Sequence, residues 1–120
     1  MRTRSLDQLT DENLIQAFAH AAIRLGEAVI NWESGAKETR HLFAIRDILR
    51  ARGRQSLLEL GPLLDDKNQF VQYYAARQLH ALFPERCRQI VEENAKQGDA
   101  IAGDAGMHLY ALDNGLHKPD

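Results

Sequence analysis

Apolar residues recur at three- and four-residue steps along most of the chain, which is the spacing of one face of an α-helix. The first such stripe consists of Leu14, Phe18, Ala21, Leu25 and Val29. Thr10 and two acidic residues stand before this stripe as a helix start, and Ser34 with Gly35 follows it as a stop signal. The pattern therefore predicts a first helix over about residues 11–33.

The same spacing continues toward the C-terminus and predicts five more helices, over about residues 36–52, 54–64, 69–82, 84–97 and 100–114. Local signals mark several ends, because Gly53 suits a C-cap, Asn68 an N-cap and Pro84 a first helical turn. Proline removes a backbone donor, so we expect Gly61 and Pro62 to kink the third helix or end it early.

Six helices with short connections are expected to form three antiparallel hairpins, and an internal repeat supports this arrangement. A shift of 30 residues superposes apolar positions of the third and fourth helices on those of the fifth and sixth. The superposed pairs are Leu57 with Cys87, Leu60 with Ile90, Val71 with Ile101, Ala75 with Ala105, Leu79 with Leu109, Ala81 with Ala111 and Leu82 with Leu112. The alternative is that two amphipathic helices fall into partial register by chance.

Composition agrees with a helical chain. The 16 Leu and 16 Ala exceed the three Val, seven Ile and three Thr, and Leu and Ala lose little side-chain freedom in a helix. A net charge of −2 lacks the overall basic character of a dedicated nucleic-acid binder. Cys87 is the single cysteine, and no segment suits a membrane span or a secretory signal, so we expect a cytoplasmic protein.

Two resemblances bear on the architecture. The segment LLELGPLLDDKNQFVQYYAARQLHAL resembles a HEAT repeat, with an acidic turn before Val71 and small residues at Ala75 and Ala76. The chain as a whole, including LTDENLIQAFA, FPER and GDAGMHLYALDNG, is similar to a small bacterial domain-of-unknown-function family, number two thousand and nineteen. This resemblance implies an all-α superhelical fold and no established activity. We therefore expect one all-α domain over residues 1–120, with about six helices in three hairpins, arranged as a HEAT- or armadillo-like α-α superhelix.

No motif for catalysis, metal binding or cofactor binding is found in the sequence. The five histidines fall on different helices or the C-terminal tail, and the spacing of the residues does not form a metal-binding motif. Cys87 aligns with Leu57 in the repeat, which favours core packing over a metal site shared with His80. We interpret Gly103 and Gly106 as positions where the last helix packs tightly on a neighbour, because the run that contains them lacks a phosphate-binding signature. The chain is expected to be neither an enzyme nor a cofactor binder.

Two surfaces are candidates for binding. The fourth helix carries a second, non-core face with Tyr and Arg, which are enriched at protein interfaces, and His108 lies on the last helix. The candidate partner-binding residues are Gln69, Tyr73, Arg77, His80 and His108. The candidate nucleic-acid-binding residues are Arg40, Arg46, Arg50 and Arg54, around the end of the second helix.

The function we predict is a non-catalytic HEAT-like module that binds another protein, such as an immunity-type binder or an adaptor. The alternative is a helical-repeat protein that binds nucleic acid through the arginines of the second helix. We expect no membrane association.

Overall fold

In the computed structural model, residues 5–97 and 100–115 are described, and every regular element within them is helical. The elements are a short 3-10 helix at Leu6–Gln8, α1 (Asp11–Ile30), α2 (Ala36–Arg52), α3 (Arg54–Leu58), a second 3-10 helix at Gly61–Asp65, α4 (Gln69–Gln78), α5 (Pro84–Ala95) and α6 (Ala100–Asp113). The predicted all-α class is confirmed. No helix of the described ranges is long and apolar enough to cross a bilayer.

Several helix ends lie where their local signals predict them. The Thr10 hydroxyl accepts a hydrogen bond from the Asn13 amide at 3.1 Å, and Asn68 caps the start of α4 with its side-chain oxygen. Gly53 ends α2 with φ of 128°, a left-handed value that glycine adopts without steric cost. These ends are specified by groups close in sequence, which is why the sequence predicts them.

Two helices are shorter than the periodicity predicts. The predicted third helix divides into α3 and a 3-10 helix that starts at Gly61, as the Gly61-Pro62 pair indicates. The predicted fourth helix, expected to continue to residue 82, ends at Gln78. Leu79 is the C-cap residue, with φ −109° and ψ 14°, and a turn follows before Phe83 and Pro84 start α5.

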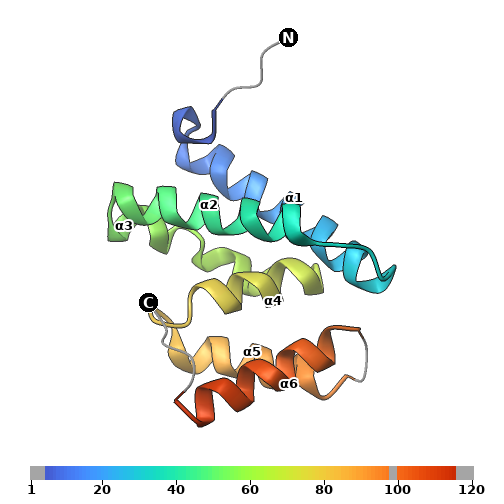
Figure 1. The fold of residues 1–120 in the computed structure, drawn as a ribbon. Coiled ribbons are helices and arrows are strands. Elements are labelled where there is room, and N and C mark those ends of the chain that lie inside the picture. Colours follow the sequence, from blue (N-terminus) through green and yellow to red (C-terminus); the bar gives the residue numbers. More distant parts are fainter. Residues whose placement is uncertain (1–4, 98–99, 116–120) are drawn as a thin grey trace.

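The helices form three consecutive pairs that lie one below another in Figure 1, from the N-terminal pair at the top to the C-terminal pair at the bottom. In these pairs α1 packs on α2, the α3 segment leads into α4, and α5 packs on α6. The central helix α4 contacts α1 and α5, and α1 also contacts α6. The radius of gyration is 14.1 Å, close to the roughly 14 Å of a compact domain of this length.

The 30-residue repeat is reproduced in the burial of its first four position pairs. The buried pairs are Leu57 with Cys87, Leu60 with Ile90, Val71 with Ile101 and Ala75 with Ala105. The correspondence weakens afterwards, because Leu79 is fully buried whereas Leu109 is partly exposed. The two hairpins differ there because α4 stops at Gln78 while α6 continues to Asp113.

The contact between α1 and α4 depends on a glycine. Gly26 is buried in α1, and a Cβ atom built on it would lie 2.2 Å from Cγ of the Phe70 ring. Such a distance is far below van der Waals contact, so α4 approaches α1 only because Gly26 has no side chain. By contrast, the prediction that Gly103 and Gly106 pack tightly is wrong. Both are exposed, with nothing within 4 Å of a built Cβ, because α6 turns Ile101, Ala105 and His108 inward.

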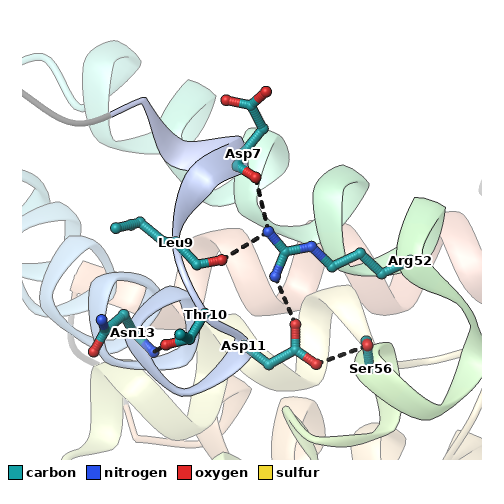
Figure 2. A network of polar contacts seen from close by, with 7 residues as sticks. All are labelled: Asp7, Leu9, Thr10, Asp11, Asn13, Arg52 and Ser56. Carbon is teal, nitrogen blue, oxygen red and sulfur yellow. Dashed lines mark hydrogen bonds and ion pairs between the residues drawn. The ribbon is translucent and has the colours of Figure 1, made fainter.

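The start of α1 is joined to the α2–α3 junction by a network around Arg52 (Figure 2). The Arg52 guanidinium donates to the Asp11 carboxylate at 2.7 Å and to the backbone carbonyls of Asp7 and Leu9 at 3.0 and 2.7 Å. Ser56 donates to the other Asp11 oxygen at 2.7 Å. The Ser56 hydrogen bond, followed by that of Arg52, lowers the pKa of Asp11 below its ordinary value. The network therefore stabilises the fold at pH values above the ordinary carboxyl pKa. This stabilisation is lost as the pH falls through the lowered pKa of Asp11.

The Gly26–Phe70 contact can be tested by Gly26→Ala. Alanine favours a helix over glycine by about 1 kcal/mol, whereas overpacking costs about 1–3 kcal/mol, so we expect a net loss of stability. The matched control is Gly103→Ala in α6, where the added methyl meets open space. It should raise the free energy of unfolding by about 0.5–1 kcal/mol. Urea denaturation measures both, and a stabilised Gly26→Ala variant would contradict the contact.

The Arg52 network can be tested by Arg52→Ala, which removes three hydrogen bonds and leaves Asp11 without its cation. We expect the free energy of unfolding to fall by about 1–2 kcal/mol. Arg54→Ala is the matched control, because Arg54 is exposed and pairs with no described residue, and it should change stability by less than about 0.5 kcal/mol. Equal denaturation midpoints for the two variants would show that the network contributes nothing.

Candidate functional site

The face of α4 that the sequence assigns to partner binding is largely buried. Tyr73 is fully buried and His80 is only 8% exposed, so the prediction of a non-core face is wrong for both. The physical reason is that α4 is the central helix: α1 covers one side, and α5 with α6 covers another. Of the five candidate residues, Gln69 and Arg77 are partly exposed, and His108 is buried.

Tyr73 and Arg77 both bind Asp104 of α6. The Tyr73 hydroxyl donates to the Asp104 carboxylate, and Arg77 Nη1 donates to the same oxygen at 2.6 Å. Burial, together with the hydrogen bond to Asp104, raises the pKa of Tyr73 far above its ordinary value, so the phenol stays protonated and remains a donor. These contacts join α4 to α6 and account for two of the five candidate residues.

The other three candidates also make contacts within the chain. The Gln69 amide donates to Asn94 at 2.8 Å and to Gln97 at 2.6 Å, which joins α4 to α5. The rings of His80 and His108 meet edge to face, with centroids 5.8 Å apart. The structure thus brings together two histidines that lie 28 positions apart in the sequence. Among the described residues, no three His, Cys, Asp or Glu side chains are placed to hold a metal ion.

The arginines of α2 differ in their surroundings. Arg46 pairs with Asp47 at 2.9 Å, donates to Gln78 of α4 at 2.9 Å and lies over the Phe43 ring at 5.0 Å. The other three candidates, Arg40, Arg50 and Arg54, are exposed. Arg46 is therefore part of the contact between α2 and α4, which the sequence does not reveal.

A groove of about 410 Å³ lies where α1, α2, α4 and α6 meet. Its lining residues are Leu25, Val29, Gly35, Ala36, Thr39, Leu42, Phe43, Tyr74, Arg77, Gln78, Ile101 and Asp104. The lining is mixed, because apolar side chains alternate with the polar groups of Thr39, Tyr74, Arg77, Gln78 and Asp104. The groove lies beside both candidate surfaces. Arg77 of the predicted partner-binding set lines it, and Gln78, which also lines it, accepts a hydrogen bond from Arg46 of the predicted nucleic-acid-binding set.

One exposed aromatic residue stands out at the end of α1. Trp32 is 94% exposed and has φ of 57°, the left-handed region that non-glycine residues rarely adopt. The Trp32 amide donates to Val29, and the Glu33 amide donates to Ala28 at 2.8 Å, the two hydrogen bonds of a Schellman motif. Trp32 thus occupies the position where helices usually carry glycine, and α1 ends three residues earlier than the sequence predicts.

Trp32 is a candidate binding residue that the apolar periodicity of α1 does not indicate. The stop signal of Ser34 and Gly35 was the stronger local pattern, and a helix extended to it would have included Trp32. The loop with Trp32 leads directly into Gly35 and Ala36, which line the groove. Two further large apolar side chains are exposed, Ile30 at the end of α1 (52%) and Phe43 in α2 (40%).

Cys87 is a core residue, as its alignment with Leu57 predicts. It is fully buried in α5, and burial raises the pKa of its thiol to about 12. The thiolate is the reactive form of cysteine, so this thiol is not a nucleophile near neutral pH.

The fold is similar to that of a solved protein. The crystal structure of the protein RPA1889 from Rhodopseudomonas palustris CGA009 matches with a TM-score of 0.84 and 30% sequence identity, over 98% of this chain and 100% of that chain. The chain belongs to the family of RPA1889. No protein-family model and no curated protein matches it. The resemblance to domain-of-unknown-function family two thousand and nineteen therefore stays a prediction.

We expect the folded protein to lose stability at alkaline pH, because it buries phenol and thiol groups that ionise in this range. Burial raises the pKa of Tyr74 to about 12 and that of Cys87 to about 12, above their ordinary values. The unfolded chain therefore loses these protons first as the pH rises, which lowers the free energy of unfolding between about pH 9 and 12. We expect a loss on the order of 3 kcal/mol from about pH 8 to 11.

Denaturation midpoints across this pH range test the expectation. Tyr74→Phe should lessen the loss, and Tyr110→Phe is the matched control because Tyr110 is 60% exposed. A pH dependence that is the same in both variants would show that Tyr74 ionises freely in the folded protein.

Proposed function

We propose that the protein is a non-catalytic, HEAT-like helical module that binds another protein through the groove and the adjoining Trp32 loop. The observation that carries this proposal is the exposed Trp32 in a left-handed conformation. We call the binding region the Trp32 surface, defined as Ile30, Trp32, Phe43 and the groove residues Arg77 and Gln78.

Trp32 is unfavourable for the isolated chain in two respects. A left-handed conformation costs an L-residue about 1–2 kcal/mol, a cost that glycine would avoid at this helix end. Its indole also remains almost wholly in water, so it gains nothing from burial. Strain held at an exposed position points to function, and tryptophan is among the residues most enriched in the energetic centres of protein interfaces.

The composition of the groove supports a protein partner over nucleic acid. Its walls include Val29, Phe43 and Tyr74, which suit an apolar side chain of a partner. Arg77 and Arg46 already pair with Asp104 and Asp47, so neither is an uncompensated cation for phosphates. The chain carries a net charge of −2.

The HEAT-like arrangement is the part of the proposal that concerns the whole fold. Support comes from the three consecutive pairs in Figure 1 and from the four buried position pairs of the 30-residue repeat. In such arrays neighbouring units bury a continuous core and leave a concave surface for partners. The predicted kinship with the bacterial domain-of-unknown-function family agrees with this arrangement.

The substitution Trp32→Gly separates folding from binding. Glycine suits the left-handed position, so we expect the variant to be more stable by about 1 kcal/mol. The same variant should lose capture of the main protein partner from an extract of the organism that encodes the chain. Capture by the immobilised full chain is to be measured with and without nuclease, and stability by urea denaturation.

Tyr110→Ala is the matched control, because it removes an exposed aromatic ring from α6. It should keep the partner that the unchanged chain captures. Retention of this partner by Trp32→Gly would refute the Trp32 surface. Capture that requires nucleic acid and is lost in an Arg40→Ala, Arg54→Ala variant would favour nucleic-acid binding instead.

A further inference from the structure

A second hollow lies between α1 and α2 and shares no residue with the groove. Its volume is about 210 Å³. The lining residues are Ala17, His20, Ala21 and Arg24 of α1 with Lys37, Glu38 and His41 of α2. We call it the α1–α2 hollow.

The hollow results from small residues at the contact between the two helices. Ala17 and Ala21 lie one helical turn apart on α1, and their methyl groups leave space that a longer side chain would fill. His20 and Arg24 are likewise one turn apart, as are Lys37 and His41 on α2. The lining of the hollow therefore combines two alanines with side chains that can donate hydrogen bonds, those of the two histidines, Arg24 and Lys37.

The charges around the hollow are unbalanced and unpaired. Arg24 and Lys37 are cations, and Glu38 is the single acidic residue of the lining. None of the polar lining side chains forms a hydrogen bond or ion pair with a residue of the described part of the chain. By contrast, two arginines of α2 are paired with acids, Arg46 with Asp47 and Arg52 with Asp11. Two neighbouring unpaired cations in a chain of net charge −2 form a local anion-attracting region.

We propose that the α1–α2 hollow binds a small molecule through a phosphate or carboxylate group. Arg24 and Lys37 hold the anionic group, because the planar arginine fork matches two oxygens of either group and the lysine adds a point charge. The imidazoles of His20 and His41 donate further N–H groups. Glu38 disfavours an oxyanion placed directly against it and can accept from a donor group of the ligand. This inference is independent of the Trp32 surface.

The test is an NMR titration of the full, isotope-labelled chain with sodium phosphate and, separately, with sodium acetate, both at an ionic strength matched with sodium chloride. We expect saturable shifts of amides around Ala17, Ala21 and Lys37 with at least one anion. Shifts with phosphate alone identify a phosphate site, and shifts with acetate alone identify a carboxylate site. The absence of saturable shifts with both anions would overturn the proposal.

Two variants separate a built site from general attraction of anions. Arg24→Gln with Lys37→Gln should weaken binding about tenfold or more, since charge-assisted hydrogen bonds are lost. Arg40→Gln with Arg54→Gln makes the same change in net charge at exposed positions outside the hollow and should leave the affinity unchanged. Equal weakening in the two variants would overturn the proposal.

A third variant, Ala17→Leu, fills the hollow while every charge remains. It should also lose the saturable shifts, while amide shifts of α5 and α6 remain those of the unchanged chain and show that the fold is intact. Binding that survives this substitution would place the anion outside the hollow.

Discussion

The structure depends on how closely α4 lies on α1 at Gly26. The Phe70 ring occupies the space where any other residue at position 26 would place its side chain. This contact fixes the central helix against the N-terminal pair, and α4 also packs on α5. Tyr73 and Arg77 of α4 reach Asp104 of α6, and Gln69 reaches Asn94 of α5. The groove at the meeting point of α1, α2, α4 and α6 is a consequence of this arrangement.

The sequence predicts what local groups determine. Thr10, Asn68, Gly53 and Pro84 act on backbone atoms within a few residues, and the structure has helix ends at or beside each of them. The apolar stripes likewise identify much of the core. The sequence could not predict the surroundings of α4, because this helix also contacts α1 and reaches Asp104 of α6, which are distant in sequence. Tyr73 and His80 resemble surface residues until Asp104 and His108 are known to lie beside them.

Glycine illustrates the same limit. Gly26 lies unmarked inside a predicted helix and is indispensable to a contact, whereas Gly103 and Gly106 suggest a contact and face open space. Intrinsic preferences are identical at the three positions, so only the distant partner decides their roles. The exposure of Trp32 is likewise not predictable from local signals. Ser34 and Gly35 indicate a helix end after Trp32, whereas α1 ends before it, at Ile30.

Our two proposals each concern a region of the surface whose local features do not stabilise the folded chain. The Trp32 surface holds an aromatic residue in a conformation better suited to glycine, and the α1–α2 hollow gathers unpaired cations. Proteins commonly accept such local costs where they bind ligands or partners, because the same groups are favourable only in the complex. The family of RPA1889 provides a second member, similar over nearly the whole chain, in which both regions can be compared.

The exposure of Trp32 in the free protein is directly measurable, because the chain has a single tryptophan. The measurement is the tryptophan fluorescence emission of the full chain at several protein concentrations, in buffer and in urea. Because Trp32 is exposed, we expect the same emission maximum in the folded and unfolded states, independent of protein concentration. A folded protein whose emission lies at shorter wavelength, and shifts to longer wavelength on unfolding, would contradict it.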